Sequence, residues 1–177
     1  KKYYIMLLDA IKKGNYKDAM DIIEHGNKED IQIKDRSENN PLHIASLCGC
    51  YEICARLIEK GLDLYETNKD NNTPLHIAIM NGYLVQHYSI INLLIKNMDD
   101  FNIVNKEGDT PIHLACMASN FDAVKLMIKS KKFRIMKDVQ NKKGDTLVNL
   151  SIIHRRNTYL ITKILLEYNV DLNIKNQ

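Results

Sequence analysis

The sequence has few of the residues that mark non-globular chains, with only seven glycines and three prolines in 177 residues. These numbers exclude a collagenous or low-complexity chain. It also has no run of about 18 apolar residues, so no membrane-spanning helix is expected. What it does have, 45% hydrophobic and 27% charged residues, predicts a soluble folded protein.

Net charge is small as well. The formal value is +3 at pH 7, which is far from the basic bias of a dedicated nucleic-acid binder, and no specific nucleic-acid binding is expected. No segment combines a basic start, an apolar stretch and a small-residue cleavage site. Without a visible secretory signal, a cytoplasmic location is predicted.

Cysteine is the next scarce residue, with four copies, three of them at positions 48, 50 and 54 and the last at 116. This crowding is unlike the disulfide framework of a small secreted domain, and the spacing matches no zinc-ligand pattern. Free thiols in a reducing compartment are therefore predicted, with no metal site. Cys54 falls at a predicted core position, whereas Cys48 falls at the surface and is a candidate for modification.

One hexapeptide recurs along the chain in three close copies and one degraded copy. Its second residue is Pro41, Pro74, Pro111 and then Leu147, at spacings of 33, 37 and 36 residues. The copies read Asn-Pro-Leu-His-Ile-Ala, Thr-Pro-Leu-His-Ile-Ala, Thr-Pro-Ile-His-Leu-Ala and Thr-Leu-Val-Asn-Leu-Ser. A segment beginning at Met6 fits the same register. A fixed period of this length indicates stacked repeats, and about five are predicted.

Each repeat has the signals of two helices. The Asn or Thr that opens the hexapeptide can cap a helix, and Pro at the first helical position gives up no hydrogen bond. Gly49 is placed to end the first helix with a positive φ. A second helix is predicted from Ile53 to Ile58, followed by a polar turn at 68–72 before the next hexapeptide.

These motifs resemble the ankyrin repeat, whose period is 33 residues and whose signature contains Thr-Pro-Leu-His-x-Ala. The resemblance implies an all-α ankyrin-repeat solenoid of helix-turn-helix units with β-hairpin-like fingers. We expect a single domain over 1–177, with approximate repeats 1–34, 35–67, 68–104, 105–140 and 141–177. It also implies that His43, His76 and His113 are structural, buried hydrogen-bonding groups. Since each lies in a separate repeat, with neighbouring helices about 8–10 Å apart, they are not expected to share a metal ion.

No catalytic motif accompanies the repeats: the sequence has no Gly-rich phosphate loop and no His-Glu-x-x-His. We therefore expect no catalytic residues and no cofactor. The predicted function is a non-catalytic protein-protein interaction module that presents a concave groove to a partner protein.

The predicted partner-binding residues fall at two repeated positions. The fingers carry a basic residue five positions before the Pro, and the first helices carry an apolar residue six positions after it. The predicted set is Arg36, Lys69, Lys106 and Lys142 on the fingers, Leu47, Met80, Met117 and Ile153 on the helices, and Cys48 and Asn81 beside them. Such a groove would fit a segment with hydrophobic anchors and acidic flanks. The alternative is that the apolar groups pack sideways on adjacent helices and that Lys is simply abundant.

The sequence allows narrower and alternative interpretations of this function. Abundant Ile, Asn and Lys together with irregular repeats suggest a viral or intracellular-pathogen effector acting on host signalling, in the host cytosol or nucleus. The rival is a targeting segment of a larger enzyme or membrane protein, because 170–177 aligns with the start of another finger. The basic run from Lys129 to Lys137 is either a solvated loop, a nuclear-import signal or an anionic-surface contact. Extra residues around Gln86 to Ser89 are expected at an edge of the repeats.

Overall fold

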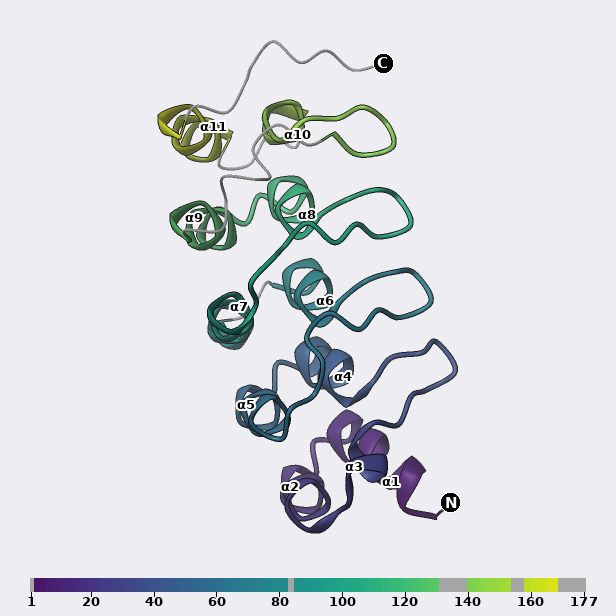
Figure 1. The fold of residues 1–177 in the computed structure, drawn as a ribbon. Helices are drawn as coiled ribbons and strands as arrows, with labels where there is room; N and C mark the ends of the chain where they lie inside the picture. Colours follow the sequence, from purple (N-terminus) through teal and green to yellow (C-terminus); the bar gives the residue numbers. More distant parts are fainter. Residues whose placement is uncertain (1, 83–84, 131–139, 154–157, 169–177) are drawn as a thin grey trace. The chain divides into compact units, whose positions relative to one another are not determined.

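The computed structural model describes residues 2–82, 85–130, 140–153 and 158–168, and all regular secondary structure in these ranges is helical (Figure 1). The predicted all-α repeat architecture is confirmed. The chain forms two compact units, 1–94 and 95–177. Helix pairs fall within each of the five predicted repeat ranges, and the assignment of 1–177 to a single domain stays a prediction.

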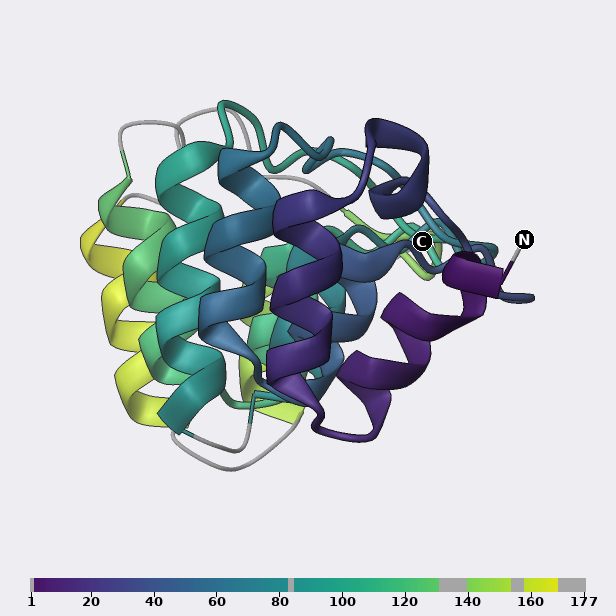
Figure 2. The ribbon, with the colours of Figure 1, turned by 90° about the horizontal axis from the view of Figure 1, so that it is seen from below.

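The first unit contains three first helices and the second helices that cover them. The first helices are α1 (Lys2–Lys12), α4 (Pro41–Cys48) and α6 (Pro74–Met80), and the others are α2 (Tyr16–His25), α3 (Lys28–Ile31), α5 (Tyr51–Glu59) and α7 (Val85–Asn97), whose end crosses into the second unit. Helix α4 packs between α1 and α6, and α2 packs on α5. Figure 2 shows α2, α5 and α7 running side by side as a layer.

The second unit repeats this arrangement with four helices. They are α8 (Pro111–Met117), α9 (Phe121–Lys129), α10 (Leu147–Ile153) and α11 (Thr158–Glu167). Helix α8 packs on α9 and α10, and α11 packs on both α9 and α10. The two first helices of this unit therefore stack on each other, and so do its two second helices.

The hexapeptides start the first helices as predicted. The Asn40 side chain accepts a hydrogen bond from the His43 main-chain N–H at 3.0 Å, and the Thr73 hydroxyl accepts one from the His76 N–H at 3.4 Å. Pro41 occupies the first turn of α4, where a missing N–H costs no hydrogen bond. Gly49 ends α4 in the left-handed conformation, with φ 74°.

The core of each unit lies between its two helix layers. In the first unit it includes Leu42 and Leu75 from the first helices and Leu57 from a second helix, all fully buried. Burying such a side chain contributes about 1.5–3 kcal/mol, so the stacked faces supply the stability that short helices lack.

The extra residues around Gln86 to Ser89 lie in the first turns of α7. They lengthen a helix of the second layer, and one of them, His87, is only 3% exposed.

Candidate protein-binding surface

Each of the four fingers, at 35–39, 68–72, 105–109 and 141–145, is held by the side chain of its first residue. The Asn68 amide oxygen accepts hydrogen bonds from the main-chain N–H groups of Asp70 and Asn72, both at 3.0 Å. Asn105 and Asn141 make the same pair of bonds in the second unit, and Asp35 does so with its carboxylate. These short side chains replace missing main-chain partners, so each finger keeps a defined shape.

Neighbouring fingers are also joined within each unit. In the first, the Lys69 N–H donates to the Ser37 oxygen at 3.0 Å, and the Asn68 amide donates to Asn39 at 2.8 Å. In the second, the Lys142 N–H donates to the Glu107 oxygen at 3.2 Å. The fingers therefore form a continuous, hydrogen-bonded edge in each unit.

The predicted basic residues sit on this edge. Arg36 and Lys69 are exposed on adjacent fingers of the first unit, and among the described residues neither cationic head forms an ion pair. Lys106 and Lys142 are exposed on adjacent fingers of the second unit, where the Lys142 ammonium donates to the Lys106 main-chain oxygen at 2.6 Å. Each unit thus presents two cations at this repeated finger position.

The predicted apolar residues lie at or near the ends of the first helices. Leu47 and Met80 are each 44% exposed in the first unit, and Ile153 is 59% exposed in the second, whereas Met117 is half-buried. Cys48 is exposed and Asn81 is half-buried, with its amide donating to the Ile77 oxygen at 2.9 Å. Exposed large apolar side chains at the same position of several repeats favour contact with another molecule.

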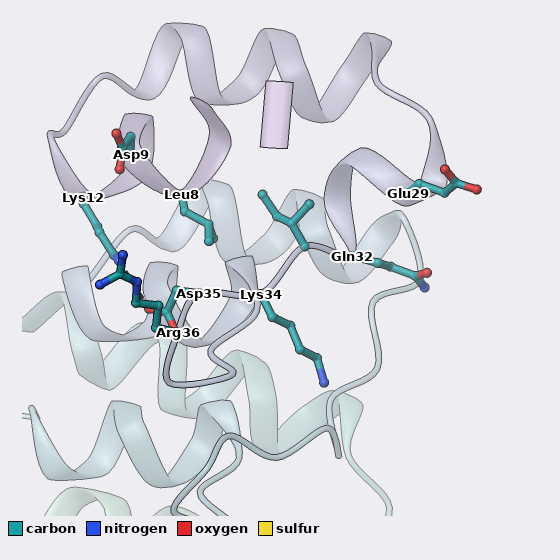
Figure 3. A pocket seen from close by; sticks show the side chains of 9 residues that line it. Leu8, Asp9, Lys12, Glu29, Gln32, Lys34, Asp35 and Arg36 are labelled. Atoms are coloured by element: carbon teal, nitrogen blue, oxygen red, sulfur yellow. Dashed lines mark hydrogen bonds and ion pairs between the residues drawn. The ribbon is translucent and has the colours of Figure 1, made fainter. Parts of the chain in front are cut away.

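A hollow of about 520 Å³ adjoins Arg36 in the first unit (Figure 3). Leu8 and Ile33 form its buried apolar part. Figure 3 shows Lys12 and Arg36 gathered at one end and Glu29 and Gln32 at the other. The Lys12 ammonium lies 3.3 Å from the Asp35 carboxylate, which leaves Arg36 as the unpaired cation of that end. The sequence pattern did not reveal this hollow, because α1 and α3 carry no copy of the hexapeptide.

All three repeated histidines are buried, with exposures of 1% or less. The Nε2 atom of His43 lies 2.8 Å from the Asn72 oxygen, while its Nδ1 accepts from the Asn40 N–H at 3.3 Å. His76 and His113 accept in the same way from Thr73 and Thr110, at 3.1 and 3.2 Å. Burial lowers the pKa of His43, so this ring is neutral in the fold. These contacts support the structural role predicted for the histidines.

All four cysteines are free; Cys48 is exposed, and the other three are buried. In the part of the chain that the structure describes, no group of three or more His, Cys, Asp or Glu is arranged to hold a metal. Most of the basic run, from 131 to 137, lies outside the described residues, as do 170–177. No described helix has both the length and the apolar character needed to cross a bilayer.

In each unit, finger edges and first-helix ends recur with the stacked helix pairs, which is the architecture of a repeat protein. The family model for ankyrin repeats in three copies matches residues 7–97 and 84–176. The chain belongs to the ankyrin repeat family.

Curated relatives share only part of this chain. The cow, mouse and human proteins called protein fem-1 homolog C are each 37% identical over 87 residues, covering 41% of this chain and 14% of the relative. The chain therefore spans about one seventh of the length of these relatives.

Proposed function

We propose that this chain binds a protein segment through its fingers and first-helix ends, with apolar anchors over the helix ends and acidic flanks against the fingers. Ankyrin repeats indicate a protein-protein interaction module. The finer proposal is carried by one observation: Leu47 and Met80 are 44% exposed in the same unit as the unpaired fingertip cations Arg36 and Lys69.

The chemistry of these groups supports this partner class. An exposed methionine adapts its shape to several apolar partners. Two unpaired cations on adjacent fingers attract carboxylates and so speed association and fix the direction of the bound segment. In the second unit, Ile153 and half-buried Met117, with Lys106 and Lys142, offer the same pairing of apolar and basic groups.

The ankyrin family is typically non-catalytic, and we propose that this chain acts by binding alone, without a cofactor and in the cytoplasm. An effector acting on host signalling, in the host cytosol or nucleus, is the narrower form of this proposal. The second candidate function is a targeting segment of a larger enzyme or membrane protein. It is favoured by the relatives, in which the matching region makes up 14% of the length.

The test is selection of peptides from a random phage-displayed library on the folded protein. We expect enriched peptides to carry one or two large apolar residues flanked by Asp or Glu, and Met80→Asp to weaken their binding at least about tenfold. A double variant that combines Arg36→Glu and Lys69→Glu should mainly slow association and reduce the dependence of the association rate on salt.

Matched controls come from the second-helix layer of the same unit. Tyr88 on α7 is 43% exposed, nearly the same as Met80, and Lys17 on α2 is an exposed cation. Tyr88→Asp and Lys17→Glu should leave peptide binding unchanged. Binding that survives the Met80 and finger variants but is lost in these controls would overturn the proposal.

A further inference from the structure

The turn between α4 and α5 consists of Cys48, Gly49 and Cys50, a motif that the binding surface does not explain. Cys48 is the last residue of α4 and is exposed, while Cys50 directly precedes α5 and is 5% exposed. Gly49 between them has φ 74°, which reverses the chain direction. The Cys50 N–H closes the turn by donating to the Ala45 oxygen at 3.0 Å.

The next repeat contacts this turn. His87 from α7 packs against it, with Nε2 3.2 Å from the Leu47 oxygen. A Cβ on Gly49 would lie 3.4 Å from the His87 ring, which is an ordinary contact, so it is the positive φ that favours glycine here. The turn is therefore closed within its own repeat and contacted by the following one.

The side chains of the turn converge on the Cys50 sulfur. Tyr16 from α2 lines the same hollow as Cys50, and Cys48 lies two residues before it across the Gly49 turn. Interactions of the Cys50 sulfur with the side chains of Cys48 and Tyr16 lower the pKa of Cys50 to about 7. The same contacts raise the pKa of Cys48, and they raise that of Tyr16 to about 12. The Cys50 side chain makes no capping hydrogen bond at the start of α5, where the helix dipole also favours a thiolate.

A hollow beside Cys50 offers a small reagent a path toward this otherwise buried side chain. Cys50 lines a hollow of about 360 Å³ together with Tyr16 and Met20 from α2 and Ile53 from α5. The titratable and charged groups around the pair are Lys12 from α1, Tyr16 and Lys17 from α2, Glu52 and Cys54 from α5, and His87 from α7.

The other two cysteines have a different setting. Cys54 and Cys116 are both 0% exposed, and burial raises the pKa of each to about 12. The only hydrogen-bonding neighbour of Cys54 among the described side chains is the Ser46 hydroxyl, at 3.8 Å. Neither is placed to form a thiolate or to meet a second thiol.

We propose that Cys48 and Cys50 form a peroxide-reactive dithiol, in which Cys50 is the attacking thiol and Cys48 the resolving one. The Cys50 thiolate attacks one oxygen of a hydroperoxide, the O–O bond breaks, and Cys50 becomes a sulfenic acid as water or an alcohol leaves. The Cys48 sulfur then attacks the Cys50 sulfur. A disulfide forms and the hydroxyl leaves with the Cys48 proton as water. Two thiols are oxidised and one peroxide is reduced.

The test uses hydrogen peroxide on the whole chain, followed by thiol blocking and peptide mass mapping. The wild-type protein should lose two hydrogen atoms through a link between Cys48 and Cys50, which dithiothreitol reverses. In Cys48→Ser the resolving thiol is absent, so a dimedone adduct should appear at Cys50. The two single variants allow the oxidation rates of the two thiols to be compared. Cys48 in the Cys50→Ser protein should be oxidised at least about tenfold more slowly than Cys50 in the Cys48→Ser protein.

Circular dichroism of each variant shows whether it is folded. If a serine variant fails to fold, the test uses the wild-type protein instead. The initial rate of iodoacetamide alkylation is then measured for each cysteine, and Cys50 is expected to react before the other three. A disulfide joining any other pair, no dimedone adduct on folded Cys48→Ser, or alkylation of Cys50 last would each overturn the proposal.

Discussion

His43 Nε2 lies 2.8 Å from the main-chain oxygen of Asn72, which comes 29 residues later and directly before the next hexapeptide. The ring therefore joins one first helix to the finger that leads into the following one. Its other nitrogen accepts from the Asn40 N–H, which places the single proton on Nε2.

Replacing His43 with Ala should destabilise the protein by about 1–3 kcal/mol, because the buried Asn40 N–H loses its partner and the Asn72 oxygen keeps only the Asn68 N–H. The effect should depend on pH. Since the pKa of His43 is lowered in the fold, the unfolded chain binds the extra proton and wild-type stability should fall as pH drops below about 6.5.

Urea unfolding at pH 7.5 and pH 5 measures both effects. The charged groups near the ring are Lys34, Asp35 and Glu66, and they are the same in both proteins. The wild-type protein should lose more stability between the two pH values than His43→Ala. Equal losses would show that His43 is not the titrating group.

Glu38 is a non-glycine residue in the left-handed region, with φ 62°, at the tip of its finger. Asn71, Gly108 and Gly144 occupy the same position in the later fingers, all with positive φ. Glu38→Gly should therefore stabilise the protein by about 0.5–1 kcal/mol, measured by thermal or urea unfolding. Ser37→Gly, next to it and also exposed, is the control, and it should be destabilising.

Gly108 combines a positive φ with a close neighbour. A Cβ there would lie 2.7 Å from the Lys142 main-chain nitrogen, which belongs to the bond joining two fingers. Gly61 has a similar φ of 81° but no atom within 4 Å of the added Cβ. Gly61→Ala should cost about 1–2 kcal/mol from backbone strain alone, and Gly108→Ala should cost more. Equal unfolding free energies would contradict the close contact.

The Cys50 thiol should respond to its tyrosine neighbour. Its alkylation rate should rise with pH around a midpoint of about 7, because the thiolate is the reacting form. Tyr16→Phe removes the hydroxyl that interacts with the thiolate, so the midpoint should move to higher pH. Tyr51→Phe, on α5 beside the same turn, serves as the matched control and should leave the midpoint in place. An unchanged midpoint in Tyr16→Phe would show that this tyrosine does not act on the Cys50 thiol.

Much of the fold follows from the sequence because its signals are local. Asn40 and Pro41 define a helix start within three residues, and Gly49 defines its end. The exposure of Leu47 and Met80 also follows from the sequence, because their position in the repeat predicts it.

The rest depends on contacts between segments far apart in the chain. No local pattern shows that His87 would pack against Gly49, 38 residues earlier, or that Tyr16 would reach Cys50. The same is true of Arg56, whose guanidinium pairs with Glu24 on a neighbouring second helix. The left-handed backbone conformation of Glu38 could not be predicted either, because the geometry of the finger overrides the preference of a glutamate for negative φ.

The binding face is tested most directly by photo-crosslinking in extracts of cells that express the protein. Benzoylphenylalanine is placed in turn at Leu47, Met80 and Tyr88, which have closely similar exposures of 44%, 44% and 43%. We expect the probes at Leu47 and Met80 to crosslink to the same protein and the probe at Tyr88 not to crosslink to it. Crosslinking from Tyr88 alone, with none from the two first-helix positions, would contradict this prediction.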